Sequence, residues 1–308
     1  MGTLISRPYA GQLELRQVIE LVHMCRALPD HDPWPPLAEV RHYLRALGNL
    51  PSADLQLWWH GAGALAAAGF VWDGEVLLAY IHPQEPREEL LAEIVAWGIT
   101  RARLLGRRNG EQPTLLVPIC AGDRYAGALL ERNRLVAQDW SILRMARSLA
   151  DPIPIPQVPH GFAIRLAASQ PDLAAATALY QEIFTAGSSV VQDRLALNRE
   201  SAGVRAAELV AVAPNGVVAA FCMCLADLHF SAQHERHEGW IDWLGTHPAF
   251  RQRGLGRAIL RAGLQQLRDT GADLALLGTA SWNTAAQRLF ASEGFRLLHQ
   301  VRWFAWEE

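Results

Sequence analysis

The chain has 308 residues, of which 50% are hydrophobic and 19% are charged, and its formal net charge is -3. At roughly 150 residues per domain, this length predicts two globular domains. The composition excludes a disordered chain, and the net charge argues against a nucleic-acid partner. All 28 basic residues are arginine. Catalysis through a lysine amine or a phosphate-loop lysine is therefore excluded, because arginine stays protonated.

The sequence also bears on compartment and membrane association. Four cysteines in a chain of this length are too few for a disulfide scaffold. Met1 to Ala10 lacks the apolar segment of a signal peptide, and the longest apolar runs fall short of the roughly 20 residues that span a bilayer. We therefore expect reduced thiols, a cytoplasmic location and no membrane partner.

The first half of the chain alternates helical and strand patterns and ends in a proline-rich segment. Helices are expected at 13–28, 37–47 and 88–105, and strands at 55–72, 76–81, 114–119 and 140–145. Four prolines lie between Asp151 and His160, where they disfavour both helix and sheet. The predicted domains are therefore residues 1–156 and 157–308.

The second half predicts a mixed α/β domain. Strands are expected at 161–166, 208–212, 217–225, 240–246, 273–279 and 295–306, and helices at 171–184, 191–200, 254–270 and 283–292. The Asn215-Gly216 pair favours a hairpin turn between the second and third of these strands. The segment from 240 to 279 reads as a βαβ unit with parallel strands.

The two halves resemble each other. His82-Pro83 and His247-Pro248 each follow a predicted strand and precede a predicted helix, 165 positions apart. A second match is offset by 160 positions and pairs Asp123, Ala126, Leu129 and Leu135 with Asn283, Ala286, Leu289 and Phe295. Such offsets indicate a duplicated fold whose copies have diverged.

The segment from Thr246 to Ala258 carries the clearest chemical signal. Gly254 and Gly256 allow close approach of a ligand to backbone N–H groups at the start of a predicted helix, where the helix dipole also favours an anion. Arginines follow at 251, 253 and 257, and guanidinium groups match phosphate oxygens. The segment therefore predicts a diphosphate site.

Two signatures in this half resemble those of the GNAT superfamily of acyl-CoA-dependent N-acyltransferases. Arg251 to Gly256 fits the pattern Arg/Gln-x-x-Gly-x-Gly/Ala at a strand-to-helix junction. The pattern Asn-x-x-Ala-x-x-Leu-Tyr-x-x-x-Gly-Phe is matched by Asn283, Ala286, Leu289, Gly294 and Phe295, with Phe290 in place of the tyrosine. A nucleotide-binding Rossmann motif is disfavoured, because Ile259 stands where a third glycine is needed.

The resemblance implies two tandem GNAT-like domains, as in mycothiol synthase, each with a mixed, mainly antiparallel sheet flanked by helices around a central βαβ unit. It implies an N-acetyltransferase that uses acetyl-CoA as co-substrate, a small-molecule amine as acceptor, and no metal. The residues that it implies for acyl-CoA binding are Leu244, Gly245, Thr246, Arg251, Gln252, Arg253, Gly254, Leu255, Gly256, Arg257, Asn283 and Phe290. Strand N–H groups of Leu244 and Thr246 would stabilise the oxyanion.

Direct transfer needs a base, because a protonated amine has no lone pair. Strand alternation predicts that Trp240, Asp242, Leu244 and Thr246 share one face, with Glu238 just upstream on the same side. Asp242 is the first candidate for the catalytic base and Glu238 the second. The alternative for Asp242 is a structural carboxylate, although an acid in an apolar strand is costly without a partner or a task.

Phe290 departs from the family pattern, since phenylalanine has no hydroxyl to protonate a departing thiolate. Thr279 and Ser281 are possible substitutes, and Phe290 could simply pack beside the pantetheine arm. The missing hydroxyl leaves two other functions open. The domain could be a catalytically silent acyl-CoA sensor, or an acyltransferase that acts on a protein or peptide N-terminus.

The first copy lacks the features of the diphosphate site. At an offset of 165 positions, Glu88, Glu89 and Leu91 stand where the second copy has Arg253, Gly254 and Gly256. Carboxylates would repel a diphosphate and a leucine would fill the space next to the backbone. We expect the first domain to be non-catalytic.

A metal site is a weaker alternative in the second half. Cys222 and Cys224 precede a segment with histidines at 229, 234 and 237. The cysteines fit the core face of a strand and the histidines a polar loop, so no metal ligand is assigned. The expected acceptor loops, 185–192 and 229–238, carry no recognisable code, and the sequence names neither the acceptor nor the oligomeric state.

Overall fold

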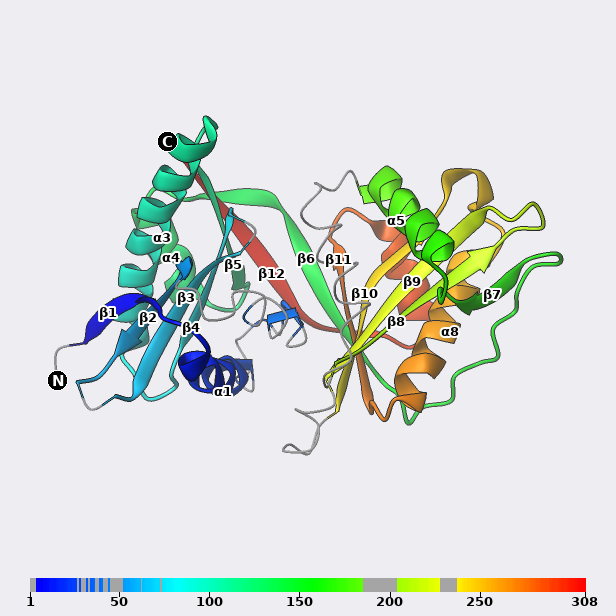
Figure 1. Ribbon diagram of the computed structural model, residues 1–308, viewed down its shortest axis with the longest axis horizontal. Helices are drawn as coiled ribbons and strands as arrows, with labels where there is room; N and C mark the ends of the chain where they lie inside the picture. The colour runs from blue at the N-terminus through cyan, green and yellow to red at the C-terminus, as the bar shows by residue number, and fades with distance from the viewer. Residues whose placement is uncertain are drawn as a thin grey trace. The chain divides into compact units, whose positions relative to one another are not determined.

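The computed structural model describes residues 4–26, 52–61, 63–72, 74–184, 204–227 and 237–308, with isolated positions between 28 and 44. The predicted helices at 37–47 and 191–200 therefore lie largely or wholly outside the described residues. The chain divides into two compact units, residues 1–143 with 299–308, and residues 144–298 (Figure 1). We call them unit 1 and unit 2.

Unit 1 contains a mixed sheet with helices packed on it. Its sheet order is β1 (Ile5–Tyr9), β2 (Ser52–Trp59), β3 (Leu65–Trp72), β4 (Val76–Ile81), β5 (Thr114–Cys120) and β12 (Arg296–Glu307). Its described helices include α1 (Leu15–Arg26), α3 (Arg87–Asn109) and α4 (Arg124–Arg132). The predicted strand at 55–72 is two strands, β2 and β3, which pair in antiparallel register.

Unit 2 has a sheet of the same kind. Its order is β6 (Val136–Ser148), β11 (Leu274–Ala280), β10 (Glu238–Thr246), β9 (Val218–Asp227), β8 (Val204–Val212) and β7 (Ala163–Leu166). Its described helices include α5 (Gln170–Phe184), α8 (Leu255–Asp269) and α9 (Thr284–Ser292). β10 and β11 are parallel, whereas β10 with β9 and β8 with β9 are antiparallel. The mixed α/β fold with a central βαβ unit is thus confirmed.

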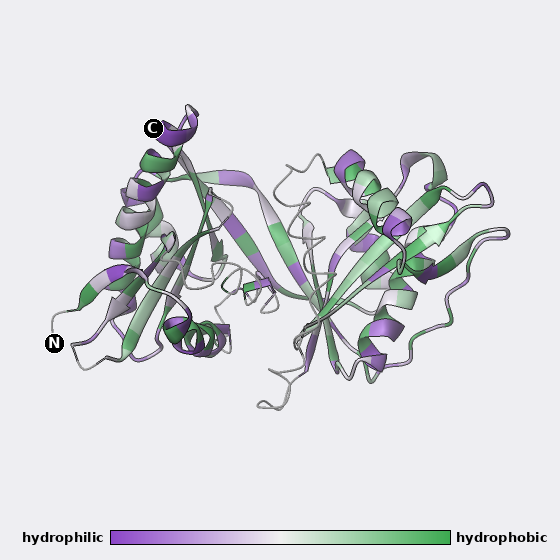
Figure 2. Ribbon diagram, in the orientation of Figure 1, coloured by the Kyte–Doolittle hydropathy of each residue, from purple (hydrophilic) through white to green (hydrophobic). Residues whose placement is uncertain are grey.

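Two helices cover opposite faces of the sheet in unit 2 (Figure 1). On one face, Tyr180 of α5 packs against Phe221 of β9. On the other face, α8 packs closely, because a Cβ on Gly263 would lie 2.7 Å from the Sγ of Cys222. Figure 2 shows β8 and β9 as largely hydrophobic, as expected for strands buried on both faces.

The division between the units differs from the predicted boundary near residue 157. The second part of β6, from Arg144 on, belongs to unit 2, and the last residues of the chain, from His299 on, belong to unit 1. Each copy therefore contributes its last strand to the other unit, where β6 lies beside β11 and β12 lies beside β5. The prolines mark the end of β6 and the irregular segment before β7 rather than the point where one unit gives way to the other.

The duplication is visible in matching elements. β5 and β11, α4 and α9, and β6 and β12 each begin 160 positions apart. Asp123 accepts a hydrogen bond from the N–H of Ala126, and Asn283 accepts one from the N–H of Ala286, so both helices have the same side-chain N-cap. The sequence match at this offset therefore corresponds to a match in local structure.

We expect the exchange of strands to control how the chain can be divided. A fragment of residues 157–308 lacks the β6 segment of unit 2 and exposes the edge of β11, whereas a fragment of residues 144–298 keeps it. The fragment of residues 144–298 should therefore show cooperative thermal unfolding by circular dichroism, and the fragment of residues 157–308 should aggregate. Equal melting temperatures for the two fragments would contradict this expectation.

Candidate functional site

The two parallel strands of unit 2 separate along their length. Glu238, Gly239 and Trp240 of β10 pair with Leu274, Ala275 and Leu276 of β11, and the register ends there. β10 continues to Thr246 paired with β9 only. The carboxyl-terminal half of β10 therefore has one edge without a neighbouring strand, and Gly278 on the opposite strand is exposed.

This open edge presents backbone donors. The N–H of His247 donates to the carbonyl of Ala219 on the β9 side, at 2.9 Å. Because alternate residues of a strand direct their N–H groups to opposite sides, the N–H groups of Leu244 and Thr246 point away from β9. They face the gap toward β11, as the predicted role in binding a carbonyl oxygen requires.

A bulge in β10 changes the expected arrangement of side chains. The register with β9 shifts between Ile241 and Trp243, so that Asp242 is the extra residue. Trp243 packs against Tyr180 of α5, with ring centroids 4.8 Å apart, whereas Leu244 packs with the core on the α8 face. The prediction that Asp242, Leu244 and Thr246 share one face with Trp240 is therefore wrong, because the inserted residue interrupts the alternation.

The start of α8 forms an open concave turn. Gly254 is the N-cap with φ 85°, Gln252 also has a positive φ of 61°, and no side chain caps the helix. A Cβ on Gly256 would lie 3.4 Å from the Oγ1 of Thr246 and 3.7 Å from a methyl group of Leu289, which is ordinary contact. The protein's own packing therefore does not require glycine at 256, whereas a ligand that approaches the free N–H groups would.

The three arginines of the motif contact different groups. The Nε of Arg251 donates to the carbonyl of Thr246 at 3.1 Å, which places this side chain at the carboxyl end of β10. Arg253 lies over the ring of Phe250, 5.5 Å from its centroid. Arg257 points to α9, where it donates to the Oγ of Ser292. Arg251 and Arg253 are thus exposed beside the helix start, and Arg257 is engaged elsewhere.

The residues of the second signature have structural roles in this unit. Asn283 caps α9 through its Oδ1 atom. Phe290 is 6% exposed and packs against Phe295, with ring centroids 5.9 Å apart. Phe290 therefore belongs to the hydrophobic core of unit 2 and offers no proton donor.

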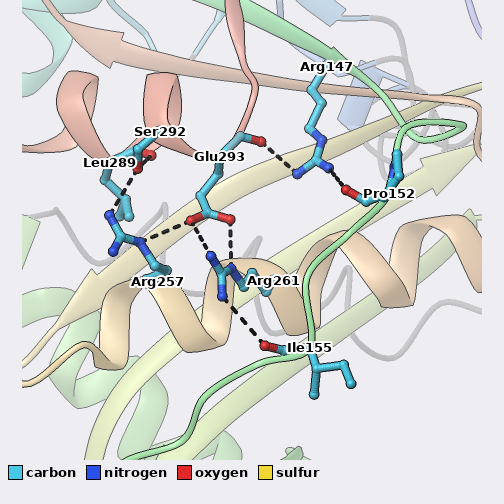
Figure 3. A network of polar contacts seen from close by, with 8 residues as sticks. All are labelled: Arg147, Pro152, Ile155, Arg257, Arg261, Leu289, Ser292 and Glu293. Atoms are coloured by element: carbon cyan, nitrogen blue, oxygen red, sulfur yellow. Dashed lines mark hydrogen bonds and ion pairs between the residues drawn. The ribbon is translucent and has the colours of Figure 1, made fainter.

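Glu293 connects these helices through a buried ionic network (Figure 3). Its side chain is 2% exposed and accepts hydrogen bonds from Nε and Nη2 of Arg261 at 2.7 and 2.9 Å. The Nε of Arg257 lies 3.0 Å from the same carboxylate. Arg147 of β6 donates to the Glu293 carbonyl at 2.6 Å and to the carbonyl of Pro152 at 2.7 Å. The network fixes α8 against α9, β6 and the proline-rich segment.

The pKa values of the arginines reflect this environment. The hydrogen bonds to the Glu293 carboxylate raise the pKa of the Arg261 guanidinium. Burial lowers the pKa of Arg147, and the charge of Glu293 opposes that effect.

Comparison with known proteins identifies the family. The model for the Acetyltransferase (GNAT) family matches residues 168–295, which include the opened strands, the α8 turn and α9. This part of the chain is a domain of the GNAT acetyltransferase family. It is therefore an acyltransferase of the acetyl-CoA-dependent kind that the two signatures predict.

Similar proteins match most of the chain. A mycothiol acetyltransferase from Thermobispora bispora is 29% identical over 283 residues, covering 84% of this chain and 90% of the relative. One from Salinispora arenicola is 29% identical over 297 residues, covering 89% and 92%. A tandem GNAT protein from the clavulanic acid biosynthesis pathway superposes with a TM-score of 0.73 at 17% identity, covering 99% of this chain and 98% of that one.

A further solved structure supports the same fold. A GCN5-related N-acetyltransferase from Sphaerobacter thermophilus superposes with a TM-score of 0.72 at 22% identity, covering 99% of this chain and 95% of that one. The tandem GNAT-like architecture is thus confirmed. No helix of the part that the structure describes is long and apolar enough to cross a membrane.

The corresponding region of unit 1 is built differently. β4 and β5 pair only between Val76 and Leu116, so these strands also separate. At the mouth, the Nη2 of Arg87 lies 2.7 Å from Asp123, which links the starts of α3 and α4. Glu88 and Glu89 occupy the first turn of α3, and Leu91 is buried. The turn carries arginines in unit 2, whereas the first turn of α3 carries two carboxylates here, and Arg87, Leu91 and Asp123 line a small cavity beside β4 and β5.

Two titratable side chains, those of Glu208 and His247, were not among the candidate residues expected from the sequence. Glu208 of β8 is 4% exposed and is in register with Met223 of β9, which in turn is in register with Trp243, so Glu208 lies on the α5 face. The Nε2 of His247 lies 3.9 Å from Glu182 of α5. Burial of Glu208 depends on sheet pairing, and no local sequence pattern could have indicated it.

The weaker metal alternative receives no support from the described residues. Cys222 and Cys224 are buried in the core, with their Sγ atoms 3.9 Å apart. His237 begins the segment before β10, and the histidines at 229 and 234 lie outside the described residues. Among the residues that the structure describes, no group of acidic, histidine and cysteine side chains could hold a metal ion.

The Glu293 network predicts a large effect on stability. Glu293→Gln removes the buried carboxylate and leaves the partly buried Arg261 without its counter-charge, and we expect the free energy of unfolding to fall by about 3 kcal/mol. Urea unfolding monitored by circular dichroism measures this change. The control is Asp269→Asn, which changes an exposed carboxylate on α8, the helix of Arg261. It should change the free energy of unfolding by less than about 0.5 kcal/mol. Equal effects would contradict the role of the network.

Proposed function

We propose that unit 2 transfers the acetyl group of acetyl-CoA directly to the amine of a small molecule, and that unit 1 is non-catalytic. One observation carries the proposal: the gap between β10 and β11 leads to an uncapped helix start at which Gly256 leaves space that the protein does not fill. A ligand with an extended arm and a diphosphate fits this combination. The same region of unit 1 is acidic.

Binding follows from the residues around the α8 turn. The free N–H groups at Leu255, Gly256 and Arg257 and the positive end of the helix dipole attract phosphate oxygens. Arg251 and Arg253 add exposed positive charge beside them. Arg257 contributes less to this site, because it is paired with Glu293.

The catalytic step uses the opened strand. Acetyl-CoA supplies a thioester whose carbonyl carbon is open to attack by a neutral amine. The N–H groups of Leu244 and Thr246 lie at the free edge of β10, where they can donate to the carbonyl oxygen as negative charge develops. Asp242, in the bulge two residues before Leu244, accepts the proton of the amine. Glu238 remains the second candidate for this base.

The departing thiolate is protonated without a tyrosine. Phe290 has no hydroxyl, and a thiol has an ordinary pKa near 8.5, so its thiolate is a tolerable leaving group. Thr279 is buried at the end of β11 and Ser281 follows it. Water or one of these hydroxyls provides the proton in the mechanism that we propose.

The acceptor is a small molecule in this proposal, because the similar curated proteins are named mycothiol acetyltransferases. Because Phe290 offers no proton donor, a second candidate function is that of an acyl-CoA sensor without catalytic activity. A sensor binds acyl-CoA but releases no thiol with any acceptor. A peptide amine as acceptor is the third possibility.

Binding is tested at the helix start. Gly256→Glu places a carboxylate in the space beside the free N–H groups, and we expect it to weaken CoA binding by at least 100-fold in calorimetry. Arg268→Glu, at the other end of α8, makes a larger change in charge far from the turn and should bind as the wild type does. Unchanged binding to Gly256→Glu would overturn the diphosphate site.

Catalysis is tested by thiol release with a panel of amines that includes the precursor of mycothiol and a peptide amine. Asp242→Asn should lower kcat by about 100-fold or more, with CoA affinity preserved, because proton transfer is lost. Glu238→Gln should have a much smaller effect. The reverse order would make Glu238 the base. Binding of CoA by the wild type without thiol release in the presence of any amine of the panel would favour the sensor.

A further inference from the structure

One aromatic side chain near the site has no role in the fold. Trp282 follows the end of β11 and is 72% exposed. Every other tryptophan that the structure describes is at least partly buried. In cores and interfaces, large aromatic side chains normally bury about 150 to 250 Å² of surface each. An exposed indole beside a ligand site therefore points to a ligand.

Its place in the fold puts it next to the α8 turn. β10 and β11 are parallel neighbours, so their carboxyl ends lie at the same edge of the sheet. β10 leads into the α8 turn and β11 leads into Trp282. Because the two strands separate beyond Trp240, the distance between their ends exceeds the ~5 Å spacing of paired strands. A group attached to a diphosphate at the turn can reach across this distance.

The local structure does not need a tryptophan at this position. Asn283, the next residue, caps α9 through its own side chain. In the first copy, the residue 160 positions earlier is Gly122, and α4 is capped by Asp123 in the same way. The loop therefore forms without an aromatic residue.

The comparison between copies also links Trp282 to the diphosphate site. The copy that has Gly254 and Gly256 has the tryptophan, and the copy with Glu89 and Leu91 has glycine in its place. The aromatic side chain thus occurs together with the features that suit phosphate, and both are missing from unit 1. Stacking on an aromatic face stabilises a nucleobase by about 1 to 3 kcal/mol.

We propose that Trp282 stacks on the purine base of the CoA nucleotide. The inference rests on the proposed function and adds a contact with the base to the contacts with the phosphates. Trp282 is then a binding residue that distinguishes CoA from the same pantetheine arm without a nucleotide.

Calorimetry with two ligands tests this contact. We compare CoA with 4′-phosphopantetheine, which has the arm and one phosphate but no purine, on the wild type and on Trp282→Ala, Trp282→Phe and Leu13→Ala. Trp282→Ala should weaken CoA binding about tenfold and leave 4′-phosphopantetheine unchanged, and Trp282→Phe should retain most of the affinity. Leu13→Ala, a change at a residue that is 98% exposed in unit 1, should alter neither.

Fluorescence provides a second readout. The difference in emission between the wild type and Trp282→Phe reports on this indole, and CoA should quench it while 4′-phosphopantetheine does not. If CoA binds Trp282→Ala as tightly as the wild type, the stacking is overturned and the proposed function stands. If the wild type binds no CoA, or Gly256→Glu binds it normally, the proposed function itself fails. An equal loss for both ligands overturns the stacking in favour of a contact with the arm.

Discussion

The early end of the β10–β11 pairing is the constraint on which the site depends. Three residues of β10 pair with β11, and beyond Trp240 the strands diverge. In a continuous parallel sheet the N–H groups of Leu244 and Thr246 would bond to β11 and would be lost to a ligand. The bulge at Asp242 lies just beyond the last paired residue, Trp240. The binding and proton transfer that we propose would therefore depend on an interruption of the regular sheet.

A rigid support compensates for this opening. Glu293 is almost fully buried and joins two arginines of α8, while its backbone carbonyl holds Arg147 of β6. Burying a carboxylate is tolerated because both of its oxygens are paired with guanidinium groups. The network engages the first two turns of α8 through Arg257 and Arg261. It fixes the direction of the helix and leaves the N-terminal N–H groups without a side-chain cap.

Local signals in the sequence indicated the fold class and the two motifs, but not the details of the sheet around them. The glycine and arginine pattern at 251–256 and the signature that begins at Asn283 depend only on neighbouring residues, and both were recognised in the sequence alone. The bulge at Asp242 depends on the register with β9, and burial of Glu293 depends on Arg147, which is 146 residues away. Trp282 stands beside a recognised motif in the sequence. It became a candidate binding residue only when the structure showed that its side chain is exposed.

The exchanged strands make the two copies depend on each other for their folds. Unit 2 takes the end of β6 from the first copy, and unit 1 takes the end of the chain. A premature stop codon just before His299 would thus damage the fold of the first half and spare most of the second. Conversely, deletion of the first half of the gene would remove part of unit 2. Neither half of the gene could therefore be lost without damage to the fold that the other half encodes.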